Sequence, residues 1–251
     1  MKRIVLTLMA AMSLLLVVIP SAPVASAAPP IDSISIVEEN LAEVEADLAA
    51  SGTDVISELD AMLSDYRGQL AASDLGRSEK NSLREQIATV EELRSDYIGY
   101  SSGYQAKGVT HPVYSVAVAT ISTWFYAKGY TLSNELLLHA KNNSRVNSSY
   151  TPVCNGNADR VLASTVFTKL KYGTKTSGTA SFPNSGNVAQ KDLYYAIHAF
   201  SWTKSGGFVT LRDRYDFAPG DYNGIAGTAV NTMYLAQQAG VLVPFYLSIR
   251  K

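Results

Sequence analysis

The chain has 251 residues, of which 47% are hydrophobic and 17% charged, and its formal net charge is −1. Its only cysteine is Cys154, which excludes an intramolecular disulfide, so the fold must depend on a hydrophobic core. The basic residues are scattered rather than clustered, which argues against nucleic-acid binding. The sequence contains no G-x-S-x-G, H-E-x-x-H or P-loop motif, which removes the common hydrolase and nucleotide-binding classes.

The N-terminus has the pattern of a secretory signal peptide. Lys2 and Arg3 precede an apolar run over residues 4–19, and small residues at 25–27 form a cleavage site. We expect residues 1–27 to be removed and the rest to be secreted by a bacterium into the extracellular space. No later stretch reaches 18 consecutive apolar residues, so we expect no membrane span in the mature chain.

Charge divides the mature chain into two unlike parts. Residues 31–100 carry 16 acidic and 5 basic side chains, whereas residues 101–251 carry 6 acidic and 14 basic ones. The second part also holds all three histidines and both tryptophans. We therefore expect an acidic helical segment over residues 28–100 and a basic, aromatic-rich domain over residues 101–251.

The acidic segment has helical periodicity in three runs. Apolar residues recur at spacings of three and four from Ile34 to Leu48, from Val55 to Leu70 and from Leu83 to Tyr97. Breaks fall at Ser51-Gly52 and at Asp74-Leu75-Gly76, and Ser78 is a plausible N-cap. The pattern predicts a helical hairpin bundle or a partly extended coiled coil. Its role could be a solvated spacer, an acidic pro-segment that masks the basic part, or an arm for self-association.

The basic part begins with helices. A helix is predicted after His111-Pro112 and up to Gly129, followed by helices over 131–143 and 157–173. His139 lies near the end of the second of these, where a partly exposed histidine stabilised by the helix dipole is common. Residues 174–187 are rich in Gly, Ser and Thr and are predicted to be a loop. A further helix is expected over 225–239, with Gly240 as its stop.

Strands are predicted where the period of the hydrophobic pattern changes from 3.6 residues to 2 residues. Residues 196–203 alternate, and a turn at Ser205-Gly206 leads into a second strand over 208–217. With that turn, three cross-strand pairs are expected: Trp202 with Val209, Phe200 with Leu211, and His198 with Asp213. A three-residue turn would instead shift the pairing by one and place Arg214 opposite His198. Residues 241–249 form a last strand, which Pro244 makes an edge or bulged strand. The fold class is therefore α+β, with a small antiparallel sheet in the C-terminal domain.

Residues 211–224, LRDRYDFAPGDYNG, contain half of the acidic side chains of the basic part: Asp213, Asp216 and Asp221. A carboxylate facing His198 could hold its imidazole in one tautomer for acid–base catalysis. The spacing D-x-x-D-x₄-D could also supply oxygen ligands to Mg²⁺ or Ca²⁺. Alternatively, Asp216 and Asp221 cap turns around residues 219–220, and Asp213 forms a surface ion pair with a neighbouring arginine.

The string Asp213-Arg214-Tyr215-Asp216 resembles the D-x-Y-D signature of colicin M-type bacteriocins, and residues 192–251 resemble terminal domains of bacterial secreted and toxin-like proteins. The resemblance implies Mg²⁺-dependent cleavage of lipid II, a pyrophosphate-linked peptidoglycan precursor, with Asp213, Tyr215 and Asp216 as the motif residues. The chain departs from that family at residues 222–223, where Tyr-Asn replaces a His-Arg pair. His198 could replace the missing histidine.

Two functions remain open at this point. The first is a secreted toxin-like hydrolase of an envelope phosphoester, with catalytic residues His198, Asp213, Tyr215 and Asp216 and a metal site of Asp213, Asp216 and Asp221. The second is a non-catalytic extracellular binding or structural protein with a helical spacer or oligomerisation arm. A lipid-linked or glycan ligand of the envelope suits either function, and no nucleic-acid partner is expected.

Overall fold

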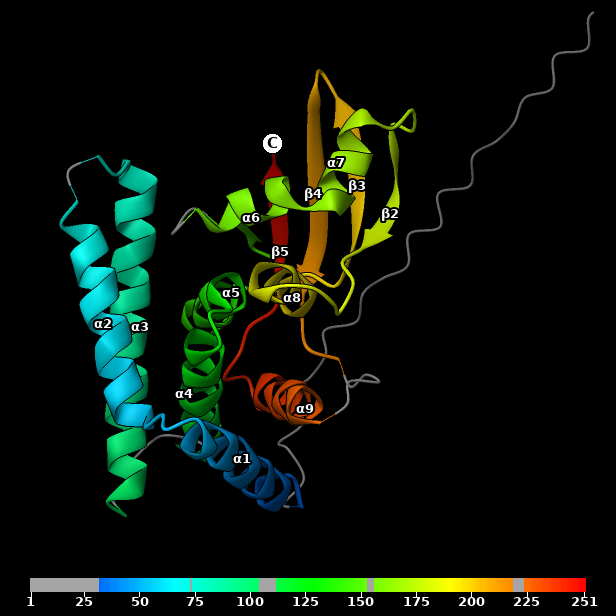
Figure 1. Ribbon diagram of the computed structural model, residues 1–251. Coiled ribbons are helices and arrows are strands. Elements are labelled where there is room, and N and C mark those ends of the chain that lie inside the picture. The colour runs from blue at the N-terminus through cyan, green and yellow to red at the C-terminus, as the bar shows by residue number, and fades with distance from the viewer. Residues whose placement is uncertain (1–31, 73, 104–111, 153–155, 219–223) are drawn as a thin grey trace, which may run out of the picture.

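The acidic part of the chain folds into helices, as its apolar periodicity predicts (Figure 1). The computed structural model describes residues 32–72, 74–103, 112–152, 156–218 and 224–251. Over the first two of these ranges it contains α1 (Asp32–Ala50), α2 (Val55–Leu70) and α3 (Arg77–Ser101). The predicted signal peptide and its cleavage site lie outside the described residues.

Side-chain carboxylates fix where α2 and α3 begin. The Asp54 carboxylate accepts the Ser57 backbone N–H at 2.8 Å, which satisfies a donor in the first turn of α2. The Glu79 carboxylate reaches back to the Gly76 N–H at 2.7 Å. Helix α3 therefore begins after Gly76, and the prediction of Ser78 as its N-cap is wrong because Ser78 already lies in the first turn.

The centre of the molecule is α4 (Pro112–Ala127), in which every residue from Val113 to Phe125 is buried. Helices α1, α2 and α3 pack against it, together with α5 (Thr131–Asn142) and α9 (Ile225–Gln238). The apolar seams of the acidic helices and the apolar residues of the basic part thus form one continuous core. Figure 1 shows α4 between the α2–α3 hairpin and α9.

Contacts between α1 and α9 join the two ends of the described chain. At the exposed rim of this contact, the Thr228 hydroxyl donates to Glu43 at 2.8 Å across 185 positions of sequence. Helix α9 ends before Gly240, which has a φ of 76° and confirms the predicted stop.

The predicted helix over 157–173 is two helices, α6 (Asn157–Ala163) and α7 (Thr165–Tyr172). Ser164 separates them: its backbone is extended, and its hydroxyl accepts the Phe167 N–H at 3.0 Å. This side-chain cap starts a new helix where the apolar periodicity alone predicts continuity. Within the described residues, no helix combines the length and apolarity needed to cross a membrane.

The described strands form a mixed five-stranded sheet in the order β1-β5-β4-β3-β2, so the α+β class is correct. β1 (Ser149–Tyr150) runs parallel to β5 (Phe245–Arg250), whereas the other neighbours are antiparallel. β2 (Ser177–Ser181) pairs with β3 (Ala199–Ser205), so the prediction of a loop over 174–187 is wrong in part. Its Ser and Thr side chains suit an exposed sheet face, and Gly178 sits over the Trp202 indole.

The hairpin of β3 and β4 (Phe208–Tyr215) turns at Gly206-Gly207, one residue later than predicted. Both glycines have positive φ, 58° and 82°, which is what a two-residue turn of type I′ requires. Centring the turn on Ser205 would place a residue with a side chain in that left-handed region. The two consecutive glycines therefore set the register.

The new register changes the predicted cross-strand pairs, and Trp202 opposes Leu211. The predicted pair of His198 with Asp213 is wrong because His198 precedes the strand altogether. Helix α8 (Val188–Ala196) extends one residue into the predicted strand, and β3 starts only at Ala199, three residues later than the alternating pattern indicates.

β5 lies between β1 and β4, so the prediction of an edge strand is wrong. Pro244 immediately precedes the strand, where its missing N–H costs no ladder hydrogen bond. Phe245, Leu247 and Ile249 are buried on the inner face of the sheet. Helix α7 packs on β4, and His139 of α5 contacts the Phe245 ring, so helices cover this face while the opposite face is exposed.

Candidate functional site

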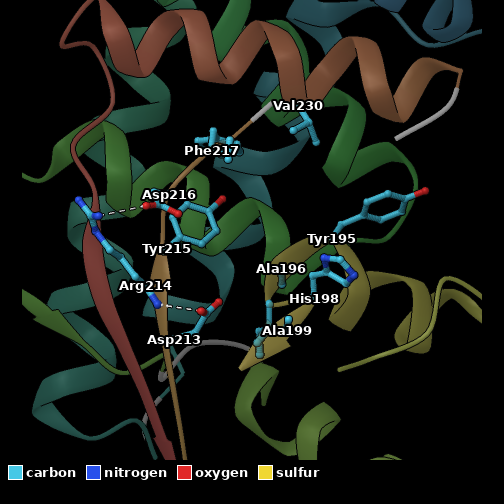
Figure 2. A pocket seen from close by; sticks show the side chains of 12 residues that line it. Tyr195, Ala196, His198, Ala199, Asp213, Arg214, Tyr215, Asp216, Phe217 and Val230 are labelled. Carbon is cyan, nitrogen blue, oxygen red and sulfur yellow. Dashed lines mark hydrogen bonds and ion pairs between the residues drawn. The ribbon is translucent and has the colours of Figure 1, made fainter. Parts of the chain in front are cut away.

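A cavity of about 200 Å³ lies where β4 ends, beside the junction of α8 and β3. Figure 2 shows its side chains converging from three parts of the chain: the end of α8 and start of β3, the end of β4, and α9. All four predicted catalytic residues line it, and so do several residues that the sequence did not single out. The lining comprises Tyr195, Ala196, Ile197, His198, Ala199, Asp213, Arg214, Tyr215, Asp216, Phe217, Ala218 and Val230.

Asp213 is a carboxylic acid on the inner, largely apolar face of the sheet. It pairs with Leu247 of β5, and Leu211 and Tyr215 flank it on the same face of β4, as strand alternation predicts. Its Oδ1 accepts the Arg214 backbone N–H at 2.8 Å. Among the described residues it forms no ion pair with Arg212 or Arg214, so the predicted surface ion pair of Asp213 is wrong.

The environment of Asp213 favours its neutral form. Burial raises the pKa of Asp213 to about 7, and the negative charge of Asp216 adds to the rise, while the Arg214 N–H opposes it. A carboxyl group with this pKa exists in both protonation states near neutral pH. It can therefore donate or accept a proton under physiological conditions.

Asp216 has a different environment at the rim of the same cavity. Its Oδ2 lies 3.4 Å from an Arg214 guanidinium nitrogen, and both side chains are substantially exposed. Figure 2 shows Arg214 on the side of β4 opposite Asp213, with its guanidinium directed to Asp216. Of the two carboxyl groups in the cavity, Asp213 is the more strongly desolvated and Asp216 is the one with a cationic partner.

His198 reaches the cavity from an unusual backbone position. Its φ is 48°, in the left-handed region that residues with side chains rarely adopt. The Phe182 N–H donates to its carbonyl oxygen at 2.7 Å, and the imidazole lies edge-on to the Tyr194 ring at 4.8 Å between centroids. The side chain is exposed at the cavity, where Figure 2 shows it across Ala196 and Ala199 from Asp213.

Tyr215 lies on the same sheet face as Asp213, as predicted, but its ring is part of the core. It stacks on Phe245 with centroids 5.0 Å apart and meets Phe217 edge-on. Burial strongly raises the pKa of its phenol. This arrangement holds the end of β4 and the cavity wall in place.

The predicted metal site can be assessed in part. Asp213 and Asp216 line one cavity, and their mutual repulsion is of the kind that a bound divalent cation relieves. Asp221 and the turn at 219–220 lie outside the described residues. Within the described ranges, no three His, Cys, Asp or Glu side chains gather closely enough to hold a metal ion.

The other histidines and the cysteine lie away from this cavity or beyond the described residues. His111 and Cys154 belong to the latter group. His139 stacks on Tyr150 at 3.8 Å, and its Nε2 is buried without a hydrogen-bond partner among the described residues. His139 is partly exposed, as predicted, but burial of its ring lowers its pKa to about 4, so the prediction of stabilisation by the helix dipole is wrong.

Sequence reasoning missed Asp192, a fully buried carboxylate in α8. It accepts the backbone N–H groups of Leu132 and Ser133, each at 2.9 Å, and contacts the Arg160 guanidinium at 2.5 Å. Burial raises the pKa of Asp192 and these donors oppose the rise. It caps α5 from a distant part of the chain, and no local pattern marks that role.

No protein-family model, curated protein or solved structure matches the chain at a significant level. The resemblance of the D-x-Y-D string to colicin M-type bacteriocins therefore stays a prediction.

Proposed function

We propose that the protein is a secreted, toxin-like bacterial hydrolase that cleaves an envelope phosphoester, such as lipid II, in the Asp213 cavity. The observation that carries the proposal is a half-buried carboxyl group with a pKa of about 7 that shares a cavity with an exposed histidine. Active sites are where burial and neighbouring charges shift pKa values toward neutrality.

The groups in the cavity can divide the steps of phosphoester hydrolysis. His198 would accept a proton from water as the water oxygen bonds to phosphorus. Asp213, protonated below pH 7, would donate its proton to the leaving oxygen as the phosphorus–oxygen bond breaks. Arg214, at the cavity rim, would offset the negative charge of the phosphoryl group. If a divalent cation binds, Asp213 and Asp216 would hold it in their ionised forms, and the cation would then neutralise phosphoryl charge in place of proton donation by Asp213.

The test uses the purified full chain and compares wild type with Asp213→Asn. Two probes report on the reaction: bis(p-nitrophenyl) phosphate, and lipid II with release of a phosphate-bearing sugar from its lipid. We expect wild type to turn over at least one probe, with a rate that falls above pH 7. Asp213→Asn should lower kcat at least about 100-fold, the usual contribution of a general acid.

Asp60→Asn is the matched control, since Asp60 is exposed on α2 and pairs only with Arg94 among the described residues. It should leave the rate unchanged. Turnover by Asp213→Asn equal to wild type would refute the role of Asp213. If wild type cleaves neither probe, with or without Mg²⁺, the alternative of a non-catalytic extracellular binding or structural protein gains support.

A further inference from the structure

The outer face of the sheet, opposite the helices, is exposed over β2, β3, β4 and β5. The strand register places two kinds of side chain on this face. Most are small hydroxyl groups, and the others are arginines and aromatic rings. The outer face comprises Ser177, Thr179, Ser181, Ser201, Thr203, Ser205, Phe208, Thr210, Arg212, Arg214, Tyr246, Ser248 and Arg250.

The charges on this outer face have one sign. No acidic side chain belongs to it among the described residues. Arg212 donates to the Thr203 hydroxyl at 3.0 Å, and the Arg250 guanidinium lies 4.5 Å from the centroid of the Phe208 ring. Within the described part of the chain, neither of these two arginines has a carboxylate partner. Arg214 has one, Asp216, at the rim.

The register also spaces the arginines regularly. Arg250 pairs with Thr210, Arg212 with Ser248, and Arg214 with Tyr246, so the arginines occupy successive rows on one face. Rows on one face of a strand are about 7 Å apart. The three guanidinium groups therefore line a track of roughly 14 Å along β4 and β5.

A hollow of about 560 Å³ lies at the Arg212–Arg214 end of this track, where Thr179, Ser201 and Tyr246 also line it. It shares Ala199, Asp213 and Arg214 with the 200 Å³ cavity, so the two hollows meet at the end of β4. A chain lying on the outer face would thus pass beside the cavity.

We propose that the outer face binds a linear polymer of hydroxyl-rich units joined by phosphodiesters, that is, a polyol phosphate. Guanidinium groups bind phosphate oxygens with paired N–H donors, and a row of them matches a repeating anion. The Ser and Thr hydroxyls between the arginines can hydrogen-bond to the hydroxyls of the repeating unit. The binding requires the arginines and not the protonation chemistry of Asp213, so it stands apart from the proposed hydrolysis.

The aromatic side chains favour this ligand over single-stranded nucleic acid. Binding of unpaired bases uses successive exposed rings as stacking platforms. On the outer face the two rings stand at opposite ends of the track, and Arg250 covers the Phe208 ring. Phe208 and Tyr246 are 48% and 47% exposed, but with one ring at each end of the track they do not form successive stacking platforms.

The experiment measures binding of the full chain to fluorescently labelled poly(glycerol phosphate) by anisotropy over a range of salt concentrations. The double variant Arg212→Gln/Arg250→Gln should bind at least 10-fold more weakly, with a salt slope lower by about two. A charge-matched double variant away from the face, Arg67→Gln/Arg84→Gln, whose residues are exposed on α2 and α3, should bind within twofold of wild type.

Three results would overturn the proposal. The first is no binding of the polymer at low salt, and the second is an equal loss in both double variants, which would show that net charge alone decides affinity. The third is tighter binding of a single-stranded oligonucleotide of equal charge that Tyr246→Ala abolishes, which would identify a nucleic-acid surface instead. A neutral polyglycerol of equal length should not bind.

Discussion

The fold favours the neutral, protonated form of the Asp213 side chain, whereas an aspartate side chain in water is ionised at neutral pH. Its neighbours on the inner sheet face are Leu211, Leu247 and the Tyr215 ring, and among the described residues no cation pairs with it. Such a carboxyl group costs free energy when it ionises in the fold. The same cost affects the stability of the protein, which can be measured without any substrate.

Protein stability should therefore depend on pH through Asp213. In the unfolded chain this carboxyl ionises near a pKa of about 3.9, whereas in the fold its pKa is about 7. Between these values the folded state binds more protons, so the free energy of unfolding falls as the pH rises. In Asp213→Asn this fall in the free energy of unfolding with rising pH should be absent. Relative to wild type, the variant should gain about 1–3 kcal/mol between pH 4 and pH 8, after allowance for the group's partial exposure.

Urea unfolding of both proteins across that pH range measures the difference. Asp60→Asn, at an exposed site, should follow the wild-type curve. Parallel curves for wild type and Asp213→Asn would mean that the fold does not hold Asp213 in its neutral form. The acid–base proposal would then lose its main support.

At the scale of single elements, the β3–β4 turn shows what decides a strand register. Gly206 and Gly207 both have positive φ, and no atom outside their chain neighbours lies within 4 Å of where a Cβ would stand. The requirement for glycine at these positions is therefore conformational rather than steric. The register in turn places Trp202 opposite Leu211 on the inner face and Ser201 opposite Arg212 on the outer face.

Gly206→Val should destabilise the protein by about 1–2 kcal/mol, the cost of forcing a side chain into the left-handed region. Gly206→Asn should cost less, because asparagine tolerates that region better. Gly68→Ala is the informative contrast: Gly68 is exposed in α2 and also open around its Cβ position, so alanine there should stabilise by about 0.5–1 kcal/mol. Thermal or urea unfolding would rank the variants, and equal effects of Val and Asn at position 206 would contradict the turn assignment.

Elements that carry their own local pattern could be predicted from the sequence. Examples are the apolar seams of α1, α2 and α3, the end of α9 at Gly240, and the placement of Asp213 and Tyr215 on one face of β4. Features set by distant contacts could not. The Ser164 hydroxyl divides α6 from α7, β2 gains strand structure only by pairing with β3, and the left-handed φ of His198 depends on where α8 ends.

The candidate site was predictable by residue type but not by geometry. The cluster of aspartates in 211–224 marks the end of β4 correctly, and His198 does line the same cavity. The reason given from sequence, a cross-strand pair with Asp213, is wrong. His198 reaches the cavity of Asp213 through the bend between α8 and β3, for which alternating hydrophobicity gives no sign.

On the scale of the whole molecule, the acidic helices and the basic part depend on one another. Helix α4 is buried on all sides. Helices α5 and α9 cover part of its surface, and α1, α2 and α3 cover the rest. Uncovering only three of its large apolar side chains costs about 5–9 kcal/mol. That loss is comparable to the whole stability of an ordinary domain, about 5–15 kcal/mol.

A chain truncated to residues 104–251 should therefore be insoluble or lack fixed tertiary packing, whereas a chain truncated to residues 28–251 should fold. Near-ultraviolet circular dichroism and size-exclusion chromatography distinguish these results. Supplying residues 28–103 as a separate chain during expression should restore soluble protein. A well-packed, cooperative 104–251 fragment would show instead that the acidic helices are dispensable for folding.

The contact between α1 and α9 has a consequence for biosynthesis. A ribosome completes α1 long before α9, and the intervening residues 51–224 take roughly 10–35 s to make at 5–20 residues per second. For that interval the seam of α1 lacks one of its two main partners, so the nascent chain remains open to a holding chaperone. Among the described helices, the first to be made is one of the last to be secured, and if the chain is exported as we propose, this delay would keep it in a form that an export channel can thread.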